Sequence, residues 1–502
     1  MVDSDLSAEV MLADLLQKEG AVISKSWIYS TEISVFQMQW FYRLGLIFFP
    51  DNWHLARSIG LALALALYAG LLLFLSRCAG LGRAGLWLTG ALLWPFGQHY
   101  LVYTLHGGYY LVYAFFYLPI LALILRGQNK DRKMQRRLLV VVCLLALAGG
   151  VNGIKELMVF HAPLCLAALA VCVLALHGTG EKDWKKAIRA SADACWVLVS
   201  SVAAAVASFV GYLFTTVVLT KICEFKSYSA ISWNRSDDWF TLDRVIADFF
   251  HEFGYQNGAY LFHFSGIATG IGLVLGAVVF VCLVRLLWRL RSLRTTDQLL
   301  TLLLFFMILV CGVCYTYFQE YNVYYWMTAI PMGMAVVAVE MKTEHFHLPG
   351  ARELTAAALA LAITVCGVHT VRREMEDPLL AHKGMDVVAD WLEQQGYTEG
   401  YATFWNANAL TGLSDGRIEM WTLVNLNDDV IMDWLQEKNH MTTDPAKPFL
   451  LIDTETDGPI EESELVRYGA CDQVYDDGRY VIFAFDSAAS VHAAAEMARN
   501  QA

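Results

Sequence analysis

The chain has 502 residues, of which 57% are hydrophobic and only 17% are charged, and its mean hydropathy is +0.44. This composition excludes an ordinary soluble enzyme, because the apolar residues form blocks long enough to cross a membrane. The net charge of −12, without a basic patch carrying interleaved aromatic residues, argues against a nucleic-acid partner. Most of the 11 cysteines lie in apolar segments without metal-type or disulfide-type spacing, so we expect them to pack as small hydrophobic residues.

The first 55 residues precede the first long apolar block and contain two predicted helices. The first, over about 6–19, places apolar side chains on one stripe and Glu9 and Asp14 elsewhere. The second, over about 31–49, is rich in Phe, Trp and Tyr, which is typical of helices at the membrane interface. We therefore expect two amphipathic helices that lie on the membrane surface.

A D-x-D motif, Asp3-Ser4-Asp5, opens this leading segment. Aspartate at a helix N-terminus commonly caps the free backbone amides and interacts favourably with the helix dipole. A carboxylate that faces water beside a membrane bundle can also serve as a general base for a substrate held at the bilayer surface. The residues alone leave both interpretations open, and one carboxylate could cap while the other is free.

The middle of the chain contains the segments that can cross a membrane. Two of them, 84–98 and 138–151, are short enough to be tilted, broken or re-entrant. The sequence predicts ten apolar segments, at about 56–77, 84–98, 108–126, 138–151, 157–177, 190–219, 261–284, 297–317, 322–341 and 353–371.

The distribution of basic residues predicts how these segments are oriented. Every second connection is basic and together these connections hold 18 Lys and Arg residues, whereas the short connections 98–107 and 152–156 hold only Lys155. The positive-inside rule places the 18 in the cytoplasm. Residues 1–55, the loop 220–260 and the tail then share the extracytoplasmic side.

That topology requires the leading segment to cross the membrane, although no apolar segment precedes it in the sequence. We therefore expect one further span before residue 1 in the natural protein.

Four regions of the predicted outer face carry candidate binding residues. Lys155 could meet a lipid phosphate or extend to the headgroups, and His99, in an aromatic-rich turn, could bind phosphate or sugar or simply lie in an interfacial anchor. Arg235 lies in the loop 220–260 among acidic and aromatic side chains that suit a sugar, although a solvated loop is the simpler interpretation. Glu320 and Tyr321 end a helix on the same side.

The composition of the tail changes to that of a soluble domain from about residue 377. Alternating helical and strand-like patterns predict a small α/β domain, with a helix at about 428–438 and a hairpin around Asp477-Gly478. No nucleotide-binding motif or nucleophile elbow occurs here, so we expect no cofactor in this domain. Trp405, Asn406 and Asn408 could touch an acceptor at a strand end, but a turn with local hydrogen bonds is the default interpretation.

The run DSDLSAEVMLADLLQKEGAVISKSWIYSTEI, followed by many spans and a polar tail, resembles the membrane glycosyltransferases of the GT-C superfamily. The resemblance in layout covers nearly the whole chain, but its specific part is the first 35 or so residues. In this family the first external loop begins with a catalytic acidic residue and continues with helices on the membrane surface. The chain departs from the pattern in lacking a preceding span and in having no Arg near Glu320, where members often bind the lipid phosphate.

The resemblance implies a polyprenyl-phosphate-sugar donor and a transfer that inverts the anomeric centre. It implies that Asp3 or Asp5 is the general base, with a slight preference for Asp3, and that both would hold a divalent cation (Mg²⁺ or Mn²⁺) if the enzyme needs one. It assigns Lys155, His99, Arg235, Glu320 and Tyr321 to the binding of lipid phosphate or substrate.

The sequence thus predicts a polytopic α-helical membrane protein with a small C-terminal extracytoplasmic α/β domain. Its expected parts are a first external loop at 1–55, a bundle at 56–371 and the soluble domain at 372–502. The expected location is a cell membrane, favouring a bacterial one. A lipid or glycan flippase would carry charged residues inside its spans, and a non-catalytic cell-envelope binding protein is the third alternative.

Overall fold

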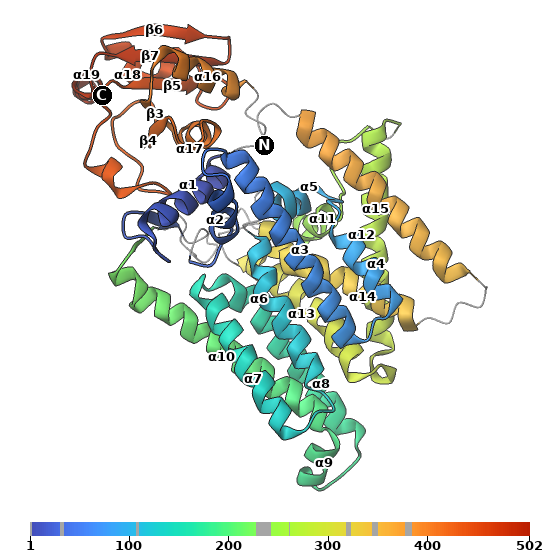
Figure 1. Cartoon of the computed structure of the whole chain (residues 1–502). Coiled ribbons are helices and arrows are strands. Elements are labelled where there is room, and N and C mark those ends of the chain that lie inside the picture. Colours follow the sequence, from blue (N-terminus) through green and yellow to red (C-terminus); the bar gives the residue numbers. More distant parts are fainter. Residues whose placement is uncertain are drawn as a thin grey trace. The chain divides into compact units, whose positions relative to one another are not determined.

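The described residues in the middle of the chain are mainly helical (Figure 1). A computed structural model describes residues 3–30, 35–106, 110–226, 242–260, 262–317, 323–343, 350–376 and 384–501. Each of the ten predicted segments contains a helix. These helices are α3 (Trp53–Ala79), α4 (Arg83–Leu92), α6 (Leu111–Arg126), α7 (Arg132–Val151), α8 (Ala162–Gly178), α10 (Ala192–Val217), α12 (Phe264–Trp288), α13 (Thr295–Tyr317), α14 (Ala329–Thr343) and α15 (Ala351–Glu376).

Seven helical stretches in the described part of the chain are long and apolar enough to cross a membrane. They correspond to α3, α7, α8 with the turn before it, α10, α12, α13 and α15. The other three predicted segments contain the shorter helices α4, α6 and α14. Side chains of α14 are buried from Ala329 to Met341, so this helix lies among others and not on the surface. The prediction of a polytopic helical membrane protein is confirmed.

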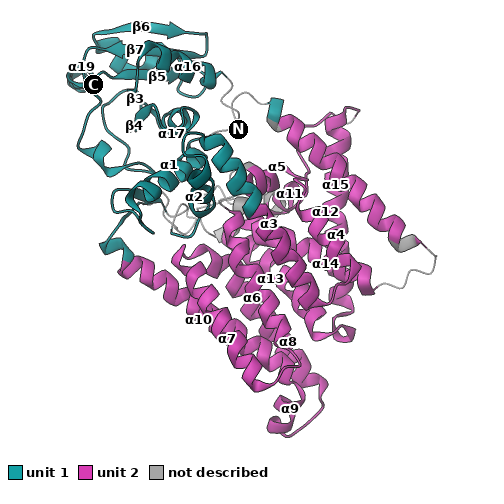
Figure 2. Cartoon of the chain, viewed as in Figure 1, with its two compact units in different colours: residues 1–63, 219–227, 374–502 teal, residues 64–218, 228–373 magenta. Residues whose placement is uncertain are grey.

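The chain forms two compact units (Figure 2). Unit 1 consists of residues 1–63, 219–227 and 374–502, and unit 2 of residues 64–218 and 228–373. Unit 1 therefore collects parts of the leading segment, the loop 220–260 and the tail, which are the three regions that the charge distribution assigns to one side of the membrane.

Small residues allow close helix packing in unit 2, where α7 lies against α10. A Cβ atom on Gly150 would lie 1.9 Å from the carbonyl oxygen of Ser208, and one on Gly211 would lie 2.1 Å from that of Leu147. The hydroxyl of Thr215 donates a hydrogen bond to the carbonyl of Val151 at 2.7 Å. Membrane helices associate through the close packing of small residues and through hydroxyl hydrogen bonds, because the hydrophobic effect does not drive helices together within lipid.

In unit 1, short segments from the leading region, the loop 220–260 and the tail contact one another. The helices of the leading region are α1 (Ser4–Glu19) and α2 (Gln39–Phe48). Strand β1 (Ile28–Ser30) pairs in parallel with β2 (Glu224–Lys226). The backbone of Ile28 also donates to the carbonyl of Gln436 in the tail. A buried cluster that includes Leu12, Trp27, Cys223 and Leu435 fills the space between these segments.

The tail is an α/β domain, as predicted. Its five strands lie in the order β4-β3-β5-β7-β6, with β3, β4 and β5 parallel and β7 antiparallel to both β5 and β6. Buried residues cover both faces of the sheet. The elements are α16 (Met385–Gln395), β3 (Glu399–Thr403), α17 (Phe404–Leu413), β4 (Glu419–Leu423), β5 (Phe449–Asp453), α18 (Glu464–Tyr468), β6 (Cys471–Asp476), β7 (Tyr480–Phe485) and α19 (Ala488–Gln501).

The helix predicted at about 428–438 is wrong. This stretch is irregular, and only Lys438–Met441 form a 3₁₀ turn. The side chains of Asn425 and Asp428 accept hydrogen bonds from nearby backbone amides, which favours turns over a helix. The hairpin around Asp477-Gly478 is confirmed as β6 and β7.

Candidate functional site

The N-terminus of α1 carries the two aspartates of the D-x-D motif. Asp3 is the N-cap: its backbone is extended, and its carboxylate accepts a hydrogen bond from the Leu6 amide at 2.8 Å. The capping role that the sequence allowed for one aspartate thus belongs to Asp3. Asp5 follows in the first turn of the helix, and its side chain is half-buried.

The environment of Asp5 suits proton transfer near neutral pH. Desolvation by the surrounding side chains, and then the negative charge of Asp3, raise the pKa of Asp5 to about 7. A base is most effective when its pKa lies near the working pH, because it is then both available and basic enough to take a proton. Asp5 is therefore the better candidate for the base, although the sequence slightly favoured Asp3.

A third carboxylate lies deeper along the same helix. Glu9 is fully buried, and burial raises its pKa well above the usual range, although the positive charge of Arg57 acts in the opposite direction. No hydrogen bond of ordinary geometry reaches either of its carboxylate oxygens from the described residues. The sequence placed Glu9 off the apolar stripe of α1 and gave no signal that it would be buried; both α2 and α17 pack against this helix.

Helix α17 of the tail lies directly against α1. The hydroxyl of Ser4 donates to the carbonyl of Phe404, and a Cβ atom on Gly412 would lie 2.4 Å from Oγ of Ser7. The beginning of α17, immediately after β3, is thus held beside the D-x-D motif. Helices that follow parallel strands begin at the carboxyl edge of the sheet, which is where ligands of such domains commonly bind.

The three tail residues singled out in the sequence lie in α17 and not in a turn. Both asparagines are fully buried: Asn406 donates to Asp457 at 3.0 Å, and Asn408 donates to the carbonyl of Leu435 at 3.1 Å. These amides stabilise loops of the domain. Trp405, by contrast, is 53% exposed at the start of the helix.

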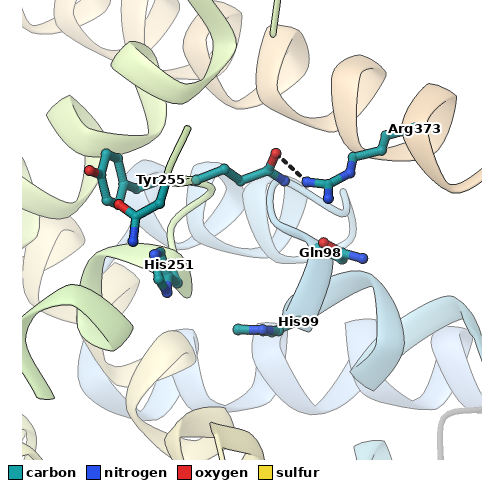
Figure 3. A pocket seen from close by; sticks show the side chains of 7 residues that line it. Gln98, His99, His251, Tyr255 and Arg373 are labelled. Carbon is teal, nitrogen blue, oxygen red and sulfur yellow. Dashed lines mark hydrogen bonds between the residues drawn. The ribbon is translucent and has the colours of Figure 1, made fainter. Parts of the chain in front are cut away.

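His99 lines a cavity of about 210 Å³ within unit 2 (Figure 3). It comes from the short helix α5 (Gln98–Leu101), and the opposite wall comes from the end of α11 (Leu242–His251) and the residues after it. Arg373, near the end of α15, completes the lining and donates a hydrogen bond to the side chain of Gln256. The lining residues are Gln98, His99, His251, Tyr255, Gln256, Asn257 and Arg373.

Each histidine of this cavity is paired with a carboxylate. Nδ1 of His99 lies 3.0 Å from Oε1 of Glu252, whose other oxygen accepts a hydrogen bond from the Tyr103 hydroxyl at 3.2 Å. Nδ1 of His251 lies 3.4 Å from Oδ1 of Asp248. Burial lowers the pKa of His99, but the Glu252 carboxylate, together with Asp248, outweighs it and raises the pKa above its usual value.

Of the other predicted binding residues, the structure describes only Lys155. Lys155 places its ammonium 5.7 Å from the ring centroid of Tyr325, and it is not among the described residues that line the cavity. Arg235, Glu320 and Tyr321 lie outside the described residues.

The structure leaves the predicted cation site at Asp3 and Asp5 untested. Among the residues that the structure describes, no three His, Cys, Asp or Glu side chains form a group that could hold a metal ion. Mg²⁺, however, commonly binds one or two protein carboxylates and completes its coordination with water and substrate phosphate oxygens. A divalent cation held by Asp3 and Asp5 therefore stays a prediction.

The sequence interpretation missed Glu9, Arg57, His251, Glu252 and Arg373. His251-Glu252 is a charged pair in a predicted external loop, and Arg373 directly follows Arg372 at the end of the last predicted span. Both signals are visible in the sequence, but only the fold brings His251 and Arg373 to one cavity. Glu9 and Arg57 carry no local signal, because they meet only when α2 and α3 fold against α1.

Comparison with solved structures identifies the fold. ArnT from Cupriavidus metallidurans, in a crystal structure with bound undecaprenyl phosphate, matches 96% of this chain and 94% of its own length with a TM-score of 0.57 and 13% sequence identity. The apo crystal structure of the same protein matches with a TM-score of 0.56 at the same coverage and identity. No protein-family model and no curated protein matches the sequence. The chain therefore has an ArnT-like fold, which confirms the fold that the resemblance to GT-C glycosyltransferases predicted.

Proposed function

We propose that this protein is a membrane glycosyltransferase that uses a polyprenyl-phosphate-linked sugar as its donor. The ArnT-like fold supports the reaction class, and the undecaprenyl phosphate bound to ArnT supports a polyprenyl phosphate as one ligand. The observation that carries the proposal is Asp5, a half-buried carboxylate with a pKa of about 7 at the start of α1. The family resemblance expects the general base to be Asp3 or Asp5, and Asp3 is the helix cap.

The proposed step is a single displacement. Asp5 accepts the proton of an acceptor hydroxyl while the acceptor oxygen forms a bond to the anomeric carbon of the donor sugar. The bond between that carbon and the phosphate oxygen breaks on the opposite face, and the polyprenyl phosphate leaves with the electron pair. Attack opposite to the leaving group inverts the anomeric centre. The step requires no general acid, because the leaving phosphate is a stable anion.

Asp3 has a supporting role in this proposal. Its carboxylate caps α1 and so fixes the first turn on which Asp5 lies. Its negative charge also keeps the pKa of Asp5 raised. Glu9 lies one turn further along the same helix, fully buried, and the positive charge of Arg57 partly offsets the rise in its pKa.

The test is the release of free polyprenyl phosphate. The purified protein would be incubated with a panel of polyprenyl-phosphate sugars in membrane nanodiscs, with and without membrane extracts as the source of acceptor. A transferase converts the donor to free lipid phosphate only when acceptor is present. A flippase would move the donor between leaflets with its sugar attached, and a binding protein would retain it unchanged, so either result would overturn the proposal.

A further inference from the structure

We propose that residues 126–137 and 181–193 of unit 2 form a basic surface that binds the headgroups of anionic phospholipids in the surrounding membrane. This surface contains the connection between α6 and α7, the first turns of α7, and the short helix α9 (Trp184–Ala190) that precedes α10 (Figure 1). Lipid binding here is independent of the proposed function, because it involves neither Asp5 nor a sugar donor.

The two stretches of the basic surface lie side by side, although they are far apart in the sequence. The backbone amide of Asn129 donates a hydrogen bond to the carboxylate of Asp193 at 2.7 Å. The indole of Trp196 donates to the carbonyl of Ile124 at 2.9 Å, and a Cβ atom on Gly127 would lie 2.4 Å from the same indole. These contacts hold the end of α6 against the start of α10. The basic residues of both connections therefore belong to one surface.

Positive charge dominates this surface. Residues 126–137 contain six Lys and Arg side chains and residues 181–193 contain four, whereas the two stretches together contain only four Asp and Glu. All ten basic side chains are exposed, and within the described part of the chain none of them forms an ion pair. A cluster of like charges that the protein does not neutralise itself attracts anions from its surroundings.

The four carboxylates of the basic surface are all engaged by backbone amides. Asp131 and Asp183 cap α7 and α9, and each accepts a hydrogen bond from an amide of its own helix, at 3.2 Å and 3.0 Å. Glu181 accepts another amide at 3.3 Å, and Asp193 accepts that of Asn129. Each carboxylate is thus held by the backbone and not by a basic side chain. The anions that balance the ten bases must come from outside the chain.

Helix α9 adds apolar side chains to the same surface. Its buried residue is Ala187, and the helix packs against α8 and α10. Trp184 and Ile188 lie one turn apart and are 67% and 40% exposed. Lys185 and Arg189 lie one turn apart on the adjacent face, and the ammonium of Lys185 is 5.7 Å from the ring centroid of Trp184. Exposed Trp and aliphatic residues beside Lys and Arg are typical of helices in the headgroup layer.

An anionic phospholipid matches both features of this surface. Its headgroup supplies negative charge for the basic side chains, and its acyl chains supply an apolar environment for Trp184 and Ile188. A soluble anion would match only the charge. Clusters of about four to eight Lys and Arg beside a transmembrane helix are typical of sites that bind anionic lipids. The positive-inside rule by itself concerns orientation during insertion and requires no such affinity in the purified protein.

Native mass spectrometry would test the inference by counting the lipids bound to the full chain in a neutral detergent. Phosphatidylglycerol is the anionic probe. Phosphatidylcholine is the zwitterionic control, because it contains the same phosphate diester without net charge. The first variant combines Lys185→Gln with Arg189→Gln and removes two charges from one face of α9.

A second variant and a matched control complete the set. Arg132→Gln combined with Lys133→Gln removes two charges from the first turn of α7, on the other stretch of the surface. Lys25→Gln combined with Lys447→Gln removes two charges from exposed side chains of unit 1. All six side chains are exposed, so each double variant should keep the Tm of the wild type.

We expect the wild type to bind phosphatidylglycerol at least about 10-fold more tightly than phosphatidylcholine. The α9 and α7 variants should each weaken phosphatidylglycerol binding by about 10-fold to 30-fold, as the loss of two charges at a membrane surface predicts. Their phosphatidylcholine binding should not change, and the unit 1 control should bind both lipids as the wild type does.

Equal affinity of the wild type for the two lipids would overturn the inference, as would wild-type phosphatidylglycerol binding in both the α9 and the α7 variant. Displacement of phosphatidylglycerol by inorganic phosphate at about the same concentration would also contradict it, because the surface would then take any phosphate anion. None of these results bears on whether Asp5 catalyses glycosyl transfer, which is measured by the release of polyprenyl phosphate.

Discussion

Asp3 and Asp5 are two residues apart, and the structure gives them different environments. The sequence could predict that one of them caps a helix, because capping depends only on the local chain. It could not predict which one titrates near neutral pH, because that depends on what surrounds each side chain. Ser4, between them, donates to Phe404 in the tail, so the surroundings of the motif include residues from the other end of the chain.

The raised pKa of Asp5 predicts a specific pH dependence. Catalysis needs the ionised carboxylate, so kcat/KM should rise with pH through about 7 and then level off. Asp3→Asn keeps a side chain that caps well and removes the negative charge that raises the pKa of Asp5. The rising limb of its pH profile should therefore move to lower pH. Identical limbs in the wild type and Asp3→Asn would contradict this assignment.

The raised pKa of Asp5 also predicts how the stability of the folded protein depends on pH. Activity should rise with pH, whereas the contribution of Asp5 to stability should fall. Asp5 holds its proton in the folded protein up to about pH 7, whereas in the unfolded chain it loses the proton in the usual carboxyl range. Its contribution to stability is thus fully present below that range and is lost as the pH rises through about 7. Asp5 therefore contributes least to the stability of unit 1 at the pH where it acts as the proposed base. Such a conflict between stability and activity is expected of a catalytic group.

Helix α1 shows how far local patterns determine an element. The apolar stripe predicted its existence and its end at about residue 19, and Gly20, in the left-handed conformation, ends the helix in the structure. The pattern did not reveal that α17 covers a second face, since α17 comes from the other end of the sequence. Glu9 is fully buried, which the pattern of the helix alone did not indicate.

Gly412 tests whether α1 and α17 must be in close contact. In Gly412→Ala the added Cβ would lie 2.4 Å from Oγ and 2.8 Å from Cβ of Ser7, so the helices must move apart. We expect a loss of about 1–3 kcal/mol in the free energy of unfolding, seen as a lower Tm in a fluorescence melting experiment. Gly70→Ala in α3 is the control, since a Cβ atom there meets nothing within 4 Å. Equal Tm values for the two variants would argue against the close packing.

Across the whole molecule, the sequence predicted a polytopic helical membrane part and the α/β character of the tail. Apolar length and charge distribution determine these features directly. It did not predict that unit 1 would combine three distant segments, because the parallel pairing of β1 with β2 leaves no local signal. The roles of Arg235, Glu320 and Tyr321 stay predictions, as does the extracytoplasmic location of the tail.

The predicted orientation can be checked by labelling single cysteines. Glu181 lies in a basic connection and Glu461 in the tail, and both side chains are exposed. In a Cys471→Ser background and right-side-out vesicles, a membrane-impermeant maleimide should label Glu461→Cys at once and Glu181→Cys only after detergent is added. The reverse pattern would show that the positive-inside assignment is wrong for this chain.

The central claim is that Asp5 is the general base of a glycosyl transfer, and the most direct test compares two aspartates of the same helix. Release of polyprenyl phosphate would be measured for Asp5→Asn and for Asp14→Asn, whose side chain forms an ion pair with Lys18 further along α1. We predict that Asp5→Asn lowers turnover by roughly 10²–10⁴-fold with its Tm preserved, and that Asp14→Asn stays near the wild-type rate. Wild-type turnover in a folded Asp5→Asn variant would contradict the account.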